Sequence, residues 1–175
     1  MDICKEVLQD IVEMIEKRKL DIAEMINTQY SFEEWFNWES FIWCKNTGKY
    51  GNNDVLPKLC YSEIIYCEEQ KSGDLYVEDE DSGVLIEFSL FFKYTSAKKW
   101  IKKIEGDREK LLSGKKAQRK ERFTGNLFFV QSVIYDMGSE QNQLKNLSFW
   151  SMPTIFSDKI NMISGSNLGI KAWQI

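Results

Sequence analysis

Apolar residues recur three or four positions apart over residues 2–27, a spacing that is typical of an amphipathic helix. The pattern predicts a break in this helix near residues 18–20. A second helix is predicted to begin at Ser31, because "SFEE" places Glu34 three residues after Ser31 in the pattern of a capping box. The apolar stripe expected on the buried side of this helix comprises Trp35, Trp38, Ile42 and Trp43.

Strand-like segments follow, separated by turn-forming stretches such as "KSGD" and "EDEDSG". The predicted strands are "SEIIYCEE" (62–69), "LYV" (75–77), "VLIEFSLFFK" (84–93), "NLFFVQSVIYD" (126–136), "INMIS" (160–164) and "LGIKAWQI" (168–175). Helices are predicted over 96–112 and within 139–150, and residues 113–122 are predicted to form a basic loop.

These segments predict one mixed α/β (α+β) domain over residues 1–175, with helices packed on a mixed central β-sheet. Residues 1–30 form an N-terminal helical segment in this interpretation, residues 31–135 form a core, and residues 136–175 supply a helix and closing strands. The apolar fraction of 43% is enough for a sizeable hydrophobic core in a chain of 175 residues.

Two carboxylates interrupt apolar patterns where a charge is costly to bury. Glu87 lies in the middle of "GVLIEFSLFFKYT", on the side of the strand opposite Ile86 and Phe88, and Glu39 lies within the predicted apolar stripe of the second helix. A salt bridge with a helix lysine, a strand end that reaches solvent or a metal ion would each explain Glu87. Glu39 is also explained if it lies at the edge of its stripe, with its carboxylate in water.

Composition narrows the chemistry that this chain can perform. It has no histidine, which excludes Ser-His-Asp, Cys-His and HExxH sites, and its four cysteines include no CxxC pair. An enzyme of this composition would need carboxylates, lysines and a hard metal ion. No apolar stretch is long enough to span a bilayer and the first residues do not resemble a signal peptide, so we expect a cytoplasmic protein that does not bind membranes.

Charge is unevenly distributed along the chain, although the formal net charge is only −4. Residues 93–122 hold 12 Lys or Arg and 4 Asp or Glu, which predicts a basic surface for DNA or RNA. A solvated helix followed by a charged loop would give the same pattern. The acidic stretch 78–81 predicts a second contact surface, for a cationic protein partner.

Asp74 lies just before the strand that pairs with the Glu87 strand in the predicted hairpin. The two carboxylates are therefore expected to lie close together, and Glu39 would join them from the helix packed on the sheet. Three converging carboxylates repel one another, and Mg²⁺ is a cation that such oxygen ligands hold. Asp74 is also explained as an ordinary turn residue after Gly73.

"GDLYV", "GVLIEFS" and "AKKWIKKIEGDREKL" together resemble the core of PD-(D/E)xK, restriction-endonuclease-like nucleases over residues 31–135. The resemblance implies that Asp74 and Glu87 hold Mg²⁺ or Mn²⁺ and that Glu39 assists them. It also implies a catalytic lysine two residues after Glu87, but Ser89 occupies that position. Either Lys98 or Lys99 folds back to replace this lysine, or the site is inactive.

The resemblance and the charge pattern together predict a metal-dependent nucleic-acid phosphodiester hydrolase. Its catalytic residues would be Asp74, Glu87, Glu39 and Lys98. Its phosphate-contacting residues would be Lys98, Lys99, Lys102, Lys115, Lys116, Arg119 and Lys120. Two alternatives stay open: a catalytically inactive, immunity-type protein that blocks a partner, and a nucleic-acid-binding protein that needs no metal.

Overall fold

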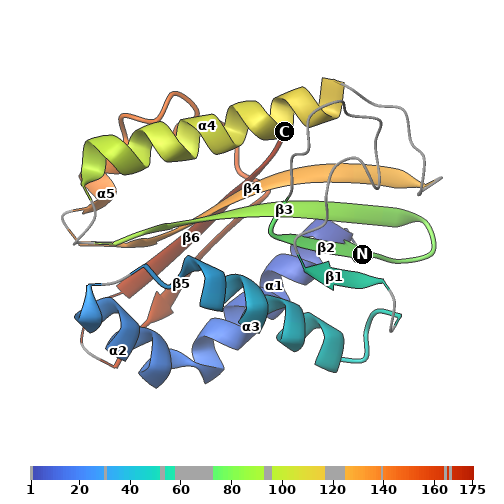
Figure 1. Cartoon of the computed structure of the whole chain (residues 1–175), viewed down its shortest axis with the longest axis horizontal. Coiled ribbons are helices and arrows are strands. Elements are labelled where there is room, and N and C mark those ends of the chain that lie inside the picture. Colours follow the sequence, from blue (N-terminus) through green and yellow to red (C-terminus); the bar gives the residue numbers. More distant parts are fainter. Residues whose placement is uncertain are drawn as a thin grey trace.

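A six-stranded mixed sheet carries helices on both of its faces in the computed structural model (Figure 1). The structure describes residues 2–29, 31–51, 54–57, 73–92, 96–116, 125–138, 140–163, 165 and 167–175, with the backbone alone at 116, 140 and 141. The helices are α1 (Ile3–Lys17), α2 (Lys19–Thr28), α3 (Glu33–Asn46), α4 (Ala97–Lys116) and α5 (Glu140–Leu144). The strands are β1 (Val55–Pro57), β2 (Leu75–Glu78), β3 (Ser82–Phe91), β4 (Asn126–Asp136), β5 (Phe156–Asn161) and β6 (Asn167–Gln174). The predicted fold class is confirmed.

The strand order β1-β2-β3-β4-β6-β5 combines antiparallel neighbours with one parallel pair, β3 and β4. β2 and β3 are antiparallel, with Leu75 opposite Ile86, whereas β3 and β4 are parallel and are joined through α4. Parallel neighbours need such a crossover because the chain must return to the end of the sheet at which the first strand began. Since β2 begins opposite Ile86, the second half of β3 extends beyond β2, and this is where Asp74 lies.

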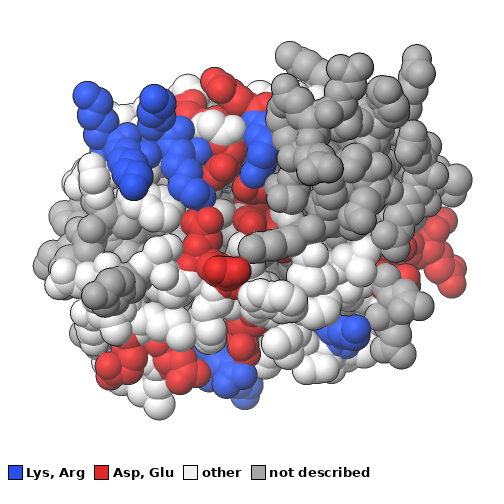
Figure 2. All heavy atoms as spheres, in the orientation of Figure 1, with Lys and Arg blue, Asp and Glu red and all other residues white. Residues whose placement is uncertain are grey.

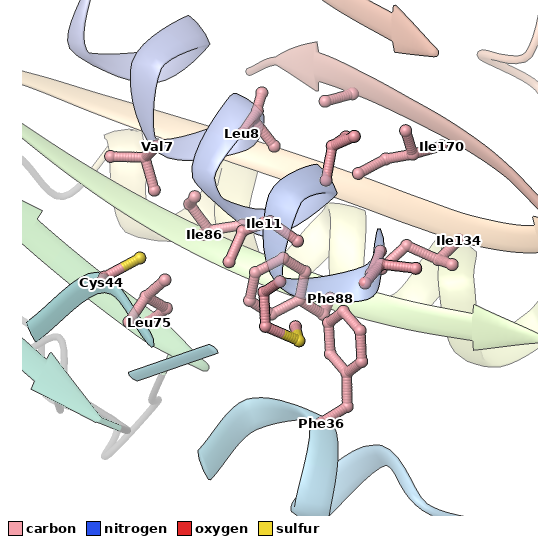
Figure 3. Packing of buried hydrophobic residues seen from close by; sticks show 14 of the residues in the cluster. Val7, Leu8, Ile11, Phe36, Cys44, Leu75, Ile86, Phe88, Ile134 and Ile170 are labelled. Atoms are coloured by element: carbon pink, nitrogen blue, oxygen red, sulfur yellow. The ribbon is translucent and has the colours of Figure 1, made fainter. Parts of the chain in front are cut away.

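The alternation of side chains along β3 divides the core between the two faces of the sheet. Ile86 and Phe88 face α1 and α3, and the Phe88 ring packs edge-to-face on Phe36 with 5.3 Å between ring centroids (Figure 3). Leu85 lies in a separate cluster on the α4 side, together with Leu111 of α4. Glu87 and Ser89 share the α4 side with Leu85, because side chains alternate along a strand.

A buried carboxylate ties α1 to the segment that follows α3. Asp10 is fully buried, forms a salt bridge with Lys49 and accepts a hydrogen bond of 2.9 Å from the Tyr50 hydroxyl. Both carboxylate oxygens therefore have partners, which offsets the free energy lost when the charge leaves water.

Several predicted elements are confirmed. The first helix breaks at Arg18, between α1 and α2, and the hairpin, the strand over 126–136 and the last strand are present. The strand predicted over 160–164 lies earlier, as β5, and the predicted basic loop is helical as far as Lys116. The predicted strand over 62–69 lies outside the described residues.

The orientation of α3 differs from the prediction. Its buried residues are Phe36, Asn37, Ser40 and Cys44. Trp38 and Ile42 are 47% and 45% exposed, so the prediction that they face the core was wrong, whereas Trp35 and Trp43 are half-buried against it. The predicted capping box was also wrong, because α3 begins at Glu33 after Phe32, without a side-chain cap.

In the part of the chain that the structure describes, no helix combines the length and the apolar character needed to cross a membrane.

Candidate active site

Asp74 is fixed against β3 at the point where β2 begins. Its backbone N–H donates to the Ile86 carbonyl (2.9 Å), and its carboxylate accepts from the Phe88 N–H (2.8 Å). The other carboxylate oxygen accepts from Asn37 Nδ2 of α3, also at 2.8 Å. These contacts hold Asp74 in one orientation beside Glu87, so the predicted proximity of the two carboxylates is present.

Glu87 has a partner on one of its two oxygens. It is only 4% exposed, and its Oε1 forms a salt bridge with Lys110 Nζ of α4. Its Oε2 is buried and has no hydrogen-bond partner among the described residues. A buried carboxylate oxygen without a partner loses its hydration with nothing in return, which makes it a position where a cation would be favourable.

The surroundings favour protonation of both carboxylates. Burial and the nearby Asp74 raise the pKa of Glu87 to about 8, although Lys110 acts in the opposite direction. Burial raises the pKa of Asp74 to about 6, and the negative charge of Glu33 contributes to this increase. The hydrogen bond from the Phe88 N–H acts in the opposite direction. Positive charge near these two groups is therefore insufficient to keep both ionised at neutral pH.

A chain of alternating charges leads from Glu87 to the start of α3. Asp107 lies 3.9 Å from Lys110 Nζ and 3.1 Å from Lys103 Nζ, which in turn lies 3.1 Å from Glu33. The Ser89 hydroxyl donates a weak hydrogen bond to Asp107 (3.4 Å). Full ionisation would leave a net charge of −2 on the group Glu33, Asp74, Glu87, Lys103, Asp107 and Lys110. Acidic side chains indeed gather in the middle of the face drawn in Figure 2, with basic side chains above them over α4.

Glu39 does not join Asp74 and Glu87. It follows Asn37 by two residues, about 200° further around α3, and it bonds Arg18 instead, with Arg18 Nε at 2.7 Å from its Oε1. Its side chain lines a groove between α2 and α3. The α3 glutamate near the site is Glu33, one turn before Asn37. The structure does not place Glu39 at the predicted site, because the buried side of α3 carries Phe36, Asn37, Ser40 and Cys44 instead.

Lys98 and Lys99 also lie away from the carboxylates. Lys98 precedes Lys110 by twelve residues, which is about 18 Å along a helix axis. Lys98, Lys99 and Lys102 are exposed on α4. The lysine that reaches Glu87 is Lys110.

Of the phosphate-contacting residues predicted further along the chain, Lys115 bonds the backbone carbonyl of Ile175. The side chain of Lys116, together with Arg119 and Lys120, lies outside what the structure describes.

Sequence reasoning missed Lys110 and Asn37. A signal for Lys110 exists, because Lys103, Asp107 and Lys110 recur at helical spacing and therefore share one side of α4. Nothing in the pattern distinguishes Asn37 from an ordinary polar helix residue.

The donors present are compatible with a hard divalent cation. Mg²⁺ binds through one or two carboxylates together with waters and phosphate oxygens, and Asp74 with Glu87 Oε2 supplies such a pair. Among the described residues, no group of three or more His, Cys, Asp or Glu side chains is arranged to hold a metal. A cation would therefore depend on the two carboxylates and on oxygens of water and substrate.

Comparisons with protein-family models, with curated proteins and with solved structures find no match to this chain. A functional proposal therefore rests on the contacts around Asp74 and Glu87.

Proposed function

We propose that this chain is a metal-dependent nucleic-acid phosphodiester hydrolase of the nuclease type, with Asp74 and Glu87 at its centre. The observation that carries the proposal is the buried, unpartnered Oε2 of Glu87 beside a second carboxylate. Lys110 offsets part of this negative charge, and a divalent cation would offset the rest. The resemblance to PD-(D/E)xK nucleases, in which an Asp and a Glu occupy these two strand positions, supports the same conclusion.

Each residue at the site has a distinct role in this proposal. When bound, Mg²⁺ or Mn²⁺ would neutralise charge on the phosphodiester and lower the pKa of water. Asn37 and the Phe88 N–H orient Asp74, while Glu87 remains fixed by Lys110. Nucleases of the PD-(D/E)xK type have a catalytic lysine at the position of Ser89. In this proposal the Lys110 ammonium performs the role of that lysine and stabilises negative charge that develops on the substrate.

The exposed lysines of α4 would hold the substrate. Lys98, Lys99 and Lys102 belong to the same helix as Lys110, so phosphates bound along α4 lead toward the carboxylates. Contacts of this kind bind DNA and RNA without reading their sequence, and they weaken as salt increases.

The test is calorimetric titration of Mg²⁺ and of Mn²⁺ into wild type and Glu87→Gln, with plasmid DNA and total RNA as cleavage substrates. We expect binding and cleavage in wild type and loss of both in Glu87→Gln. Glu109→Gln is the matched control, because Glu109 is exposed on the same helix. Absence of metal binding in the wild type would contradict the proposal. Nucleic-acid binding that survives EDTA and the Asp74→Asn, Glu87→Gln change would instead indicate a metal-independent binding protein.

A catalytically inactive, immunity-type binding protein is the second candidate. The observation that favours it is an acidic turn, in which Glu80 and Asp81 are exposed and could meet a cationic partner. Reversing the charge of these two residues should abolish partner binding in a protein of this type, whereas a nuclease should keep its activity. Asp79 is unsuitable for this test because its carboxylate accepts hydrogen bonds from the backbone N–H groups of Asp81 and Ser82 and so stabilises the turn.

A further inference from the structure

α2 and α3 lie on the opposite side of the sheet from α4 (Figure 1). Residues of both helices line a groove. Its volume is about 440 Å³, and its walls include Asp21, Glu24 and Met25 of α2 with Trp35 and Glu39 of α3. The α2 residues recur at i, i+3 and i+4, so one side of each helix faces the groove.

An exposed apolar stripe continues from the groove along α3. Trp35, Trp38 and Ile42 are spaced at i, i+3 and i+7, which places them on one side of the helix. Trp38 and Ile42 are 47% and 45% exposed. Large apolar side chains gathered at one surface are typical of a place where another molecule binds, and tryptophan dominates the energetics of such contacts.

The groove also carries an excess of negative charge. Among the described residues that line the groove, Arg18 is the one cationic side chain, and it already bonds Glu39 at 2.5 Å and lies 3.7 Å from Asp21. Glu24 is exposed and forms no ion pair with any residue that the structure describes. Three carboxylates against one guanidinium favour a cationic occupant and disfavour a nucleic acid or an anionic membrane surface.

We propose that this surface binds an amphipathic, cationic helix of a partner protein. A helix laid into a two-helix groove presents apolar residues at i, i+3, i+4 and i+7, which match the spacing of Trp35, Trp38 and Ile42. Its basic residues would pair with Asp21 and Glu24. The surface lies across the sheet from Glu87 and Lys110, so the proposal is independent of the nuclease activity.

The test uses a fluorescein-labelled, 18-residue peptide with leucine at the helical spacing and lysine elsewhere, and a scrambled peptide of the same composition. Fluorescence anisotropy should show binding of the amphipathic peptide to wild type. Trp38→Ala should weaken binding at least about tenfold, as the loss of a central aromatic contact does. Ile42→Lys should weaken it as well, through charge repulsion. Asp21→Asn with Glu24→Gln should weaken it and reduce its salt dependence.

Glu13→Gln with Glu109→Gln is the matched control, because it removes two exposed carboxylates that do not line the groove. Absence of binding, equal binding of the scrambled peptide, or an equal loss in the control would overturn the proposal. Self-association that Trp38→Ala abolishes, measured by sedimentation velocity, would overturn it in favour of a second copy of this chain. Trp38 and Ile42 are each about half exposed, and circular dichroism melts check that the variants fold.

Discussion

One carboxylate oxygen of Glu87 forms a salt bridge with Lys110. The other oxygen is buried and has no hydrogen-bond partner among the described residues. A strand of apolar residues holds this carboxylate out of water, so its charge must be balanced by protonation, by a lysine or by a metal ion. Lys110 supplies part of that balance in the structure. The other two contributions can be separated by experiment.

The stability of the metal-free protein should fall as pH rises above about 5. Burial and the nearby Asp74 raise the pKa of Glu87 in the folded state to about 8, above its ordinary value of 4.5, so the folded state binds more protons than the unfolded state between these two values. Unfolding free energy then decreases with pH, on the order of 1 kcal/mol per pH unit within that window. Urea denaturation of Glu87→Gln between pH 5.5 and 8.5 should show a flatter profile than wild type. Parallel profiles would mean that Glu87 is ionised throughout.

Lys110→Met should have opposite effects on metal affinity and on cleavage. An ammonium beside Glu87 repels a divalent cation, so its removal should tighten Mg²⁺ binding by about tenfold, which corresponds to about 1.4 kcal/mol. Cleavage should fall at least about a hundredfold, because charge stabilisation in the transition state is a large catalytic contribution. Calorimetry and plasmid cleavage measure the two effects. Lys99→Met removes an exposed lysine of the same helix. It should change Mg²⁺ affinity by less than tenfold and cleavage by less than a hundredfold. Unchanged cleavage in Lys110→Met would show that this lysine is structural.

The residue pattern predicted that Glu87 and Asp74 lie close together, because strand alternation and hairpin geometry depend on local order along the chain. It did not predict Lys110, since α4 contains several lysines and the packing of the helix on β3 decides which one reaches Glu87. The prediction of Lys98 rests on its place at the start of the helix. Its axial distance from Lys110, about 18 Å, shows why nearness in sequence was a poor guide.

At the scale of the element, α3 shows where periodicity loses its predictive value. Large apolar residues occur on nearly every side of this helix, so the pattern does not select one buried side. Phe36 and Asn37 face inward because they contact Phe88 and Asp74 in the hairpin, which are contacts between distant parts of the chain. The error in orientation moved Glu39 into the predicted site and Trp38 into the predicted core.

A pair of aromatic substitutions tests the orientation of α3. Phe36→Ala should lower the free energy of unfolding by about 3–5 kcal/mol, because Phe36 is 1% exposed and packs on Phe88. Trp38→Ala should change it by less than about 1 kcal/mol, since Trp38 is 47% exposed. Urea denaturation of both variants measures the difference. Equal destabilisation would mean that Trp38 is part of the core.

At the scale of the whole molecule, charge is separated between the two faces of the sheet. The α4 face carries exposed lysines around a cluster of acidic residues, whereas the groove between α2 and α3 is acidic. The formal net charge of −4 conceals this separation. A polyanion should therefore approach along α4, and a cationic partner should approach the opposite face.

Salt dependence tests whether nucleic acid binds along α4. Lys98→Gln, Lys99→Gln and Lys102→Gln together should weaken DNA binding and reduce the slope of log affinity against log salt. Each lost phosphate contact removes about 0.9 from the slope for duplex DNA, so a reduction of about 2–3 is expected. Fluorescence anisotropy with a labelled duplex, over a series of salt concentrations, measures this slope.

The matched control neutralises three exposed lysines on the other helices: Lys5, Lys17 and Lys45. It changes the net charge of the protein by the same amount, so a non-specific attraction to the whole molecule would give the same reduction in slope. A reduction confined to the α4 variant would locate the phosphate contacts along the first turns of α4, the helix that also carries Lys110. If the two variants behaved alike, the uneven charge along the chain would reflect a solvated helix, and the nuclease proposal would lose its substrate-binding surface.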